Sequence, residues 1–175
     1  MLKLKQLWAV AAAGVLLAAP GAQAALVSLG DGTVKDTNTN LIWLQNWNVT
    51  GLQDWNTQKA WAETTLDGFA GSSDWRLPEI SEYAALFTAY GNLGAVANFT
   101  NVQFYGYSSG TDIAGGSWVF NPVVGVQFGA NHVTPLYAVA VRPGDVTSSV
   151  PEPQSLALAL LALGATAVAR RKRSR

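Results

Sequence analysis

The chain has 175 residues, no cysteine, one histidine and 11 side chains of each charge. It therefore has no disulfides, no thiolate chemistry and no pair of histidines for a zinc site. The zero formal charge hides an acidic middle, since residues 25–149 hold ten acidic and four basic side chains, which leaves no basic patch for nucleic acid.

The N-terminus has the pattern of a secretory signal peptide. It combines a basic start, an uncharged apolar run and a small-residue cleavage pattern: Lys3 and Lys5, residues 6–19, and Ala22 and Ala24. The pattern predicts that residues 1–24 are a signal peptide, which signal peptidase removes after passage through the secretion translocon. Residues 25–144 would then form an exported domain. An uncleaved N-terminal anchor is the alternative, and it exports the domain equally.

Residues 25–48 are predicted to form two or three strands. Their short apolar runs are separated by Asp31-Gly32, which favours a tight hairpin turn, and by a Thr/Asn cluster that ends at Asn40. Asparagine tolerates the left-handed backbone conformation that a second turn needs.

Two helices are predicted next. In the first, Asp54 or Asn56 caps the N-terminus and Gly68 marks the end; in the second, Pro78 suits the first turn and Gly91 follows the last. The residues expected to share one face are Ala60, Trp61 and Thr64 in the first helix and Ile80, Tyr83, Ala84, Phe87 and Tyr90 in the second.

Residues 102–142 contain short β-favouring pieces between glycine-containing turns: VQFYGYSS, SWVFN, VVGVQFG and LYAVAVR. Their β-branched and aromatic residues predict the strands of a small sheet. The order of strands, two helices and more strands predicts an α+β fold rather than a βαβ alternation.

The C-terminal segment is hydrophobic and ends in a basic cluster. Residues 155–169 carry no charge, and as a helix rising ~1.5 Å per residue they would reach about 22 Å, short of the ~30 Å hydrocarbon core of a bilayer. We therefore predict a linker at residues 145–154 and a marginal membrane helix with a basic tail at residues 155–175. The membrane-flanking basic residues, Arg170, Arg171, Lys172 and Arg173, place the tail in the cytoplasm and the domain outside.

Motifs between residues 29 and 142 carry a family resemblance. GDGTVKDTNTNLIW, SSDWRLPEISEY, YGYSSGT, SWVFN and YAVAVR resemble successive elements of the bacterial domain of unknown function 1566, also called the Lcl C-terminal domain. That family is similar to the C-type-lectin-like fold. The resemblance implies an α+β domain with two helices and a small, mostly antiparallel sheet.

One of these motifs is interpreted as structural. Its residues are Asp74, Trp75, Arg76, Leu77 and Pro78. Arg76 is expected to pair with Asp74 or Glu82, while the leucine and the proline fix the start of the second helix.

RLPEISEYAA is also similar to a helix of formylglycine-generating enzymes, which share the C-type-lectin-like fold and work through cysteines or the copper that these hold. Members of the family often carry two cysteines, whose approximate counterparts are Ala62 and Ala140. A chain without cysteine cannot inherit that oxidase chemistry.

The tail resembles the PEP-CTERM sorting signal of Gram-negative bacteria that make extracellular polysaccharide. The motif Val150, Pro151, Glu152 and Pro153 precedes the apolar segment and the basic cluster. The resemblance implies that an exosortase-like protease cleaves near the motif, so that a transient single-pass anchor in the inner membrane gives way to a cell-surface or secreted protein. An ordinary tail anchor is the alternative.

Residues with catalytic or metal-binding potential are few. His132 is interpreted as a loop histidine, since no base and nucleophile are evident beside it. Asp36, Asn38 and Asn40 resemble the start of a calcium loop, but Leu41 and Trp47 occupy positions that need glycine and glutamate, so a turn is predicted. We expect no cofactor and no metal.

Six tryptophans in the exported domain offer faces that can stack on sugar rings, and most of them, Trp43, Trp75 and Trp118 included, are expected in the core. Trp47 and Trp55 flank the polar loop NVTGLQD and are the candidate ligand-binding residues.

We predict an exported, non-enzymatic surface or secreted protein that binds exopolysaccharide or another surface component. A structural component of the extracellular matrix or biofilm without a specific small ligand is the alternative, and an enzyme is the least favoured reading.

Overall fold

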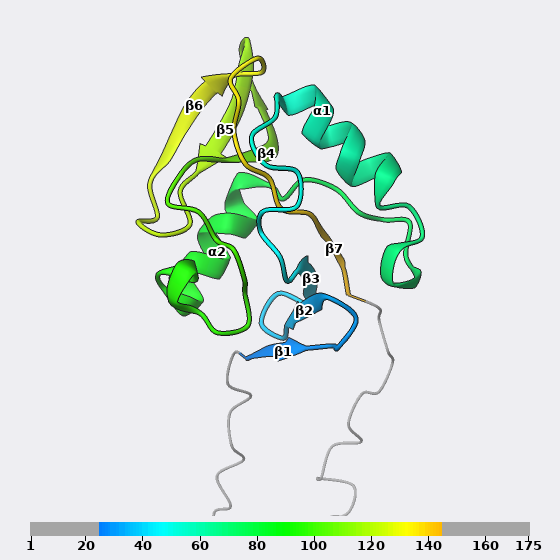
Figure 1. Cartoon of the computed structure of the whole chain (residues 1–175). Coiled ribbons are helices and arrows are strands. Elements are labelled where there is room, and N and C mark those ends of the chain that lie inside the picture. The colour runs from blue at the N-terminus through cyan, green and yellow to red at the C-terminus, as the bar shows by residue number, and fades with distance from the viewer. Residues whose placement is uncertain (1–24, 145–175) are drawn as a thin grey trace, which may run out of the picture.

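The computed structural model describes residues 25–144, which form two helices and two small antiparallel sheets (Figure 1). The α+β class is confirmed, but the single predicted sheet is divided in two. One sheet has the order β1-β2-β3-β7 and the other the order β4-β5-β6. The strands are β1 Leu26–Ser28, β2 Thr33–Asp36, β3 Leu41–Leu44, β4 Tyr107–Ile113, β5 Gly116–Phe120, β6 Gln127–Asn131 and β7 Val141–Pro143.

The turns of the first sheet follow from local chemistry. The Asp31 carboxylate accepts from the backbone N–H of Thr33 at 3.0 Å, and Gly32 has a φ of 85°. Asn40 adopts the predicted left-handed conformation, with a φ of 55°. Three strands therefore form between residues 25 and 48, as expected.

The first helix changes type along its length. α1, Trp55–Ala60, is capped by Asp54, whose carboxylate accepts from Thr57 N at 3.0 Å, and a π-helical turn continues it at Trp61–Thr65. The π turn inserts one extra residue and so rotates the buried face. The predicted face is therefore wrong except for Trp61, and the residues that are buried are Trp55, Gln58, Trp61, Ala62 and Leu66.

The second helix, α2, spans Ile80–Tyr90. Its N-cap is Glu79, which forms a capping box with Glu82, so Pro78 lies just before the cap and not in the first turn. Gly91 ends the helix with a φ of 70° and donates its N–H to the carbonyl of Phe87. The fully buried residues of this helix are Tyr83 and Leu86, and the predicted core position Ala84 is only half-buried.

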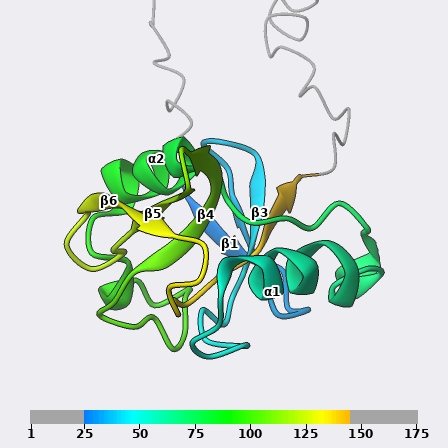
Figure 2. The ribbon, with the colours of Figure 1, turned by 90° about the horizontal axis from the view of Figure 1, so that it is seen from above.

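The segment before and within β7 joins the two sheets. Leu136 pairs with Gln53, Tyr137 forms a parallel bridge with Tyr107, and Val141 pairs with both Arg76 and β3. Seen from above, β4 lies between α1 and α2, and both helices contact it (Figure 2). A single hydrophobic core results, built largely on aromatic rings.

β6 lies far from the ends of the described chain. β1, which begins the described residues, lies at the bottom of Figure 1, and β7, which ends them, runs through the lower half, whereas β6 lies in the upper half. The predicted signal peptide, linker and hydrophobic helix, at residues 1–24, 145–154 and 155–175, lie outside the described residues.

Candidate functional site

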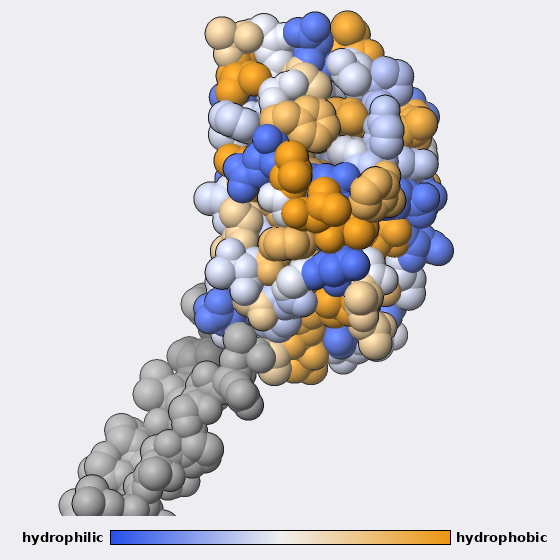
Figure 3. Space-filling view, turned by 90° about the vertical axis from the view of Figure 1, so that its left-hand side faces the viewer, coloured by the Kyte–Doolittle hydropathy of each residue, from blue (hydrophilic) through white to orange (hydrophobic). Residues whose placement is uncertain are grey.

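Exposed aromatic side chains gather beside β6. Phe104 and Tyr105 precede β4, Phe128 belongs to β6, and Tyr137 lies between β6 and β7. The first three are 69%, 49% and 42% exposed, and Tyr137 is half-buried. We call these four residues the aromatic surface. Figure 3 views the molecule from the β6 side and shows hydrophobic side chains grouped across the middle of that face.

Contacts between separate segments bring Tyr105, Phe128 and Tyr137 together, and Phe104 adjoins them through the chain. The rings of Tyr105 and Tyr137 meet edge to face, with centroids 6.1 Å apart. Phe128 lies against Gly106, because a Cβ atom at that glycine would come within 3.1 Å of Phe128 Cζ and 2.6 Å of Val119 Cγ1. Glycine at position 106 thus lets the ring of Phe128 pack against the backbone beside Tyr105.

The backbone under the aromatic surface is fixed by hydrogen bonds. Tyr137 N donates to the carbonyl of Gly106 at 3.1 Å, and Ser108 N donates to the carbonyl of Tyr137 at 2.9 Å. Gln103 N donates to the hydroxyl of Tyr107 at 2.9 Å. The Tyr107 hydroxyl remains able to accept this bond as a neutral group, because burial raises the pKa of Tyr107. A ligand would meet a preorganised surface, with little ordering left to do.

The aromatic surface lies in a part of the chain that is almost without charge. From Tyr83 to Val141 there is no lysine or arginine, Asp112 is the one acidic residue, and His132 is the one histidine. Amides and hydroxyls supply most of the other polar side chains there. Such a surface can stack and form hydrogen bonds, but it cannot form an ion pair with an anionic ligand.

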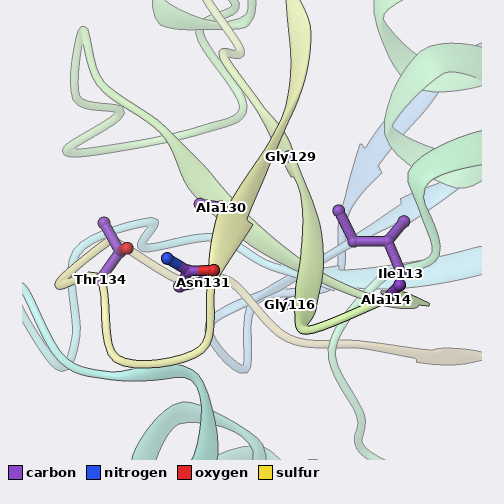
Figure 4. Close-up of a pocket in the computed structure, with 7 residues that line it drawn as sticks. All are labelled: Ile113, Ala114, Gly116, Gly129, Ala130, Asn131 and Thr134. Carbon is purple, nitrogen blue, oxygen red and sulfur yellow. The ribbon is translucent and has the colours of Figure 1, made fainter.

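A shallow hollow of about 430 Å³ lies at one end of the β4-β5-β6 sheet (Figure 4). Its lining residues are Ile113, Ala114, Gly116, Gly129, Ala130, Asn131 and Thr134. They include one amide and one hydroxyl, and in Figure 4 the side chains of Ile113 and Thr134 stand on opposite sides of the strands. The hollow holds no acid-base pair and no strong nucleophile.

His132 packs as a loop residue. Its ring stacks on Trp55 with centroids 4.2 Å apart, and its Nε2 lies 3.5 Å from Asp112 Oδ1. The Asp112 side chain is 68% exposed, and no second carboxylate is paired with the histidine. Within residues 25–144 no group of three histidine, aspartate or glutamate side chains is arranged to hold a metal ion.

The predicted tryptophan platform is buried. Trp47 is 0% exposed and stacks on Trp43, while Trp55 is 7% exposed and donates Nε1–H to the carbonyl of Ser109 at 2.8 Å. The exposed position expected for both is therefore wrong. The reason is long-range pairing, because Trp47 N donates to the carbonyl of Thr100 and draws the polar loop onto the core.

Trp118 differs from expectation in the opposite direction. It lies in β5 and is only half-buried, whereas the other tryptophans of residues 25–144 are buried. Its cross-strand neighbour in β6 is Gly129, which has no side chain to cover the indole. Trp118 therefore borders solvent on the sheet.

The DWRLP segment ties the second helix to both sheets. Arg76 pairs with Glu82 and not with Asp74, through Nη1–Oε2 and Nη2–Oε1 distances of 2.8 and 2.6 Å. The backbone of Arg76 exchanges two hydrogen bonds with Val141, and Trp75 Nε1–H donates to the carbonyl of Phe69. The remaining two residues of the segment are buried: Leu77 and Pro78.

The turn at Asp36 uses its carboxylate internally. The side chain is 1% exposed and accepts from Asn38 N, Thr39 Oγ1 and Tyr90 Oη at 3.0, 2.7 and 2.7 Å. Burial and the hydrogen bond to Asp36 raise the pKa of Tyr90. These contacts fit the predicted turn and anchor α2 to the first sheet.

Two sets of positions that the family resemblance singled out do not contribute to a site within residues 25–144. The counterparts of the family cysteines, Ala62 and Ala140, are both 0% exposed. The sorting and membrane-flanking residues, Val150 to Pro153 and Arg170 to Arg173, lie outside residues 25–144. No helix in the described part has the length and hydropathy needed to cross a membrane.

Sequence reasoning missed the aromatic surface. QFYGY was assigned to a strand, but β4 begins only at Tyr107, which leaves Phe104 and Tyr105 in an exposed loop. VVGVQFG is predicted to form a strand of the sheet; its last residues do so, in β6, which lies at the edge of the β4-β5-β6 sheet. One signal in the sequence could have shown this. Phe104 and Tyr105 are adjacent, whereas a strand with one buried face alternates apolar and polar side chains.

Comparison with known families gave two matches. The family model of the Lcl C-terminal domain matches residues 32–142, and that of the PEP-CTERM protein-sorting motif matches residues 149–174. No curated protein matches the chain. The first match spans the aromatic surface and the core beneath it, and the second covers the predicted sorting motif.

Proposed function

Because the chain belongs to the Lcl C-terminal domain family and carries a PEP-CTERM sorting motif, we propose that it is a non-enzymatic surface protein that binds exopolysaccharide. The motif indicates export, sorting to the cell envelope and processing by exosortase-type machinery. The proposal includes the signal peptide, a transient inner-membrane anchor and release to the cell surface or medium. It also includes a C-type-lectin-like fold, which the two helices and small antiparallel sheets support.

The aromatic surface is the observation that carries this proposal. Contiguous exposed aromatic groups on a soluble domain are uncommon without a binding role, because they cost solvation free energy. Rings of Phe and Tyr offer flat apolar faces that match the C–H faces of sugars, and the tyrosine hydroxyls add hydrogen bonds. Trp47 and Trp55, being buried, have no part in it.

The direction of the surface suits a protein tethered at its C-terminus. β7 precedes the sorting segment and runs downward through the lower half of Figure 1, whereas β6 lies in the upper half. A domain held through its C-terminal segment would therefore present β6 away from the membrane, where extracellular polysaccharide lies.

Replacing two exposed rings tests the proposal. The double change Phe104→Ala and Tyr105→Ala is expected to weaken binding at least about tenfold, equal to about 1.4 kcal/mol, because each truncation removes a stacking face. The measurement is affinity electrophoresis of the full-length protein in detergent, in gels that contain extracellular polysaccharide from the producing cells.

The matched control is Val27→Ala, which truncates another exposed hydrophobic side chain on β1, at the opposite end of the molecule. It is expected to migrate as the wild type does. Equal retardation of wild type and the double variant would remove the aromatic surface from the proposal. No retardation of the wild type at all would refute exopolysaccharide binding.

A structural role in the extracellular matrix is the second candidate, favoured by the free edge of β6. No other strand within residues 25–144 pairs with that edge, and Gln127–Asn131 contains no charge and no proline to block pairing. Asn121 N donates to Val126 O, and hydrogen-bonded and non-hydrogen-bonded pairs alternate along an antiparallel ladder. Gly129, opposite Trp118, therefore belongs to a non-hydrogen-bonded pair, and its backbone N–H and C=O point away from β5 toward the free edge.

A charge on this edge tests the second candidate. If β6 edges pair between copies, Gln127→Lys is expected to weaken self-association about tenfold, because edge lysines oppose strand pairing. Sedimentation velocity over a concentration series measures it, with Asn56→Lys on the exposed side of α1 as the control of equal charge. A wild type that stays monomeric at every concentration would count against a matrix built through β6.

A further inference from the structure

We infer that the ligand of the aromatic surface is an uncharged polysaccharide rather than an acidic one. This inference rests on the proposed function, and it names the chemical class of the ligand. It follows from where the charged side chains of the domain lie and from which polar groups surround the exposed rings.

Cations are absent from the half of the domain that carries the surface. Residues 83–141, which contain β4, β5, β6 and all four aromatic positions, include no lysine and no arginine. Acidic polysaccharides carry carboxylates or sulfates, and proteins bind such groups through Arg and Lys. The aromatic surface has no such partner to offer.

The four basic side chains elsewhere in residues 25–144 are engaged or distant. Arg76 forms its ion pair with Glu82, and Lys59 lies 3.8 Å from Glu63 and over the ring of Trp55. Arg142 is 5% exposed and lies over the ring of Trp75, and Lys35 belongs to β2 in the other sheet.

The overall field also opposes anions. Residues 25–144 hold nine acidic side chains against four basic ones, a formal charge of 4 − 9 = −5. A polyanion approaching this domain meets repulsion with no local cation to offset it, and that repulsion is strongest at low salt.

The polar groups beside the rings match neutral hydroxyls. Asn101 and Gln103 precede Phe104, so amides accompany the exposed aromatics in the loop before β4. An amide both donates and accepts hydrogen bonds, as a sugar hydroxyl does, whereas a carboxylate only accepts. Gln103 Nε2 already donates to the carbonyl of Asn101 at 2.8 Å, which positions its amide oxygen to accept from a hydroxyl.

The test compares binding to neutral and to acidic polysaccharide. Extracellular polysaccharide from the producing cells is divided by anion exchange into an unretained neutral fraction and a retained acidic fraction. Binding of the full-length protein in detergent to each fraction is measured by calorimetry at low and high sodium chloride. We expect binding to the neutral fraction with a Kd that changes less than about twofold with salt, because no ion pair is screened.

Three variants complete the test. Tyr105→Ala is expected to weaken binding to the neutral fraction about tenfold, while Tyr105→Phe keeps most of it, because stacking rather than the hydroxyl dominates. Gln103→Lys, which adds one cation next to Phe104 in the loop before β4, is expected to gain affinity for the acidic fraction that the wild type lacks.

The possible outcomes separate the inference from the proposed function. Preferential binding of the acidic fraction, or a Kd that rises tenfold or more with salt, would overturn the inference and leave exopolysaccharide binding in place. Binding of neither fraction would refute the proposed function. Binding of the neutral fraction that Tyr105→Ala leaves unchanged would overturn the assignment to this surface.

Discussion

Trp47→Ala is expected to lower the free energy of unfolding by about 3–5 kcal/mol, the usual cost of truncating a buried tryptophan. The indole is 0% exposed and stacks on Trp43 with centroids 5.9 Å apart and planes 10° from parallel. It also contacts the rings of Tyr83, Phe99 and Tyr107. No single neighbour can move to fill the space, because each is held by its own contacts.

That loss is large for a domain of this size. Single domains are stable by about 5–15 kcal/mol, so the substitution would remove about a fifth of the stability or more. Urea denaturation of the full-length protein in detergent, followed by near-ultraviolet circular dichroism of the aromatic core, measures the change.

Two variants serve as controls for this prediction. Trp118→Ala removes a half-buried indole from β5 and is expected to cost clearly less, because solvent already covers part of the ring. Trp47→Phe keeps an aromatic ring in the core and is expected to retain polysaccharide binding. A stable Trp47→Ala protein that had lost only polysaccharide binding would contradict the structural role and restore Trp47 as a ligand residue.

Above about pH 10, the ordinary pKa of tyrosine, the free energy of unfolding is expected to fall steeply. Burial raises the pKa of Tyr83 and of Tyr107 in the folded state. The unfolded chain releases both phenolic protons above pH 10 while the folded chain keeps them, so rising pH favours unfolding. Below pH 10 both states are protonated, and this contribution to stability is fully present.

The slope can be bounded from linkage. Each buried tyrosine contributes at most about 1.4 kcal/mol per pH unit, so the pair would cost up to about 2.7 kcal/mol per unit until the folded-state pKa values are reached. Denaturant unfolding at a series of pH values from about 9 to 11, with tyrosinate absorbance recorded in parallel, measures both stability and ionisation.

Phenylalanine at positions 83 and 107 is the control for the alkaline transition. The hydroxyls removed take part in internal hydrogen bonds, among them Tyr83 Oη–H to the carbonyl of Ser108 and Gln103 N–H to Tyr107 Oη. The double variant is expected to be less stable at neutral pH but to lose stability more slowly above pH 10. A slope equal to that of the wild type would show that other groups control alkaline unfolding.

Local features of the fold were predictable because adjacent residues control them. Asp54 caps α1, Gly91 ends α2 and Asn40 forms the left-handed turn, each through backbone groups within a few residues. The same locality explains one partial failure. Pro78 fits the first turn of a helix, but Glu79 caps better because Glu82 can reciprocate, and the helix therefore begins at Ile80, two residues after the proline.

The candidate site was not predictable in the same way. Trp47 and Trp55 beside a polar loop gave the pattern of an exposed platform, yet pairing with Thr100 and with the carbonyl of Ser109 buries both. Phe128 lies in a predicted strand, and the sequence did not show that this strand, β6, would be at the edge of its sheet within the described residues. Exposure depends on which distant segments pair, and a single sequence does not contain that information locally.

The sequence by itself determined the chemical limits of this protein: no thiols, one histidine, a sorting motif, and a stretch from residue 83 to 141 with a single charged carboxylate. These properties depend only on composition and order. The tertiary structure decided which aromatic rings face solvent, because Tyr105, Phe128 and Tyr137 come together only after β5 has paired with β4 and β6 and the segment before β7 has paired with Tyr107. Burial is a property of long-range packing, and it moved the candidate binding surface from two tryptophans to four residues beside β6.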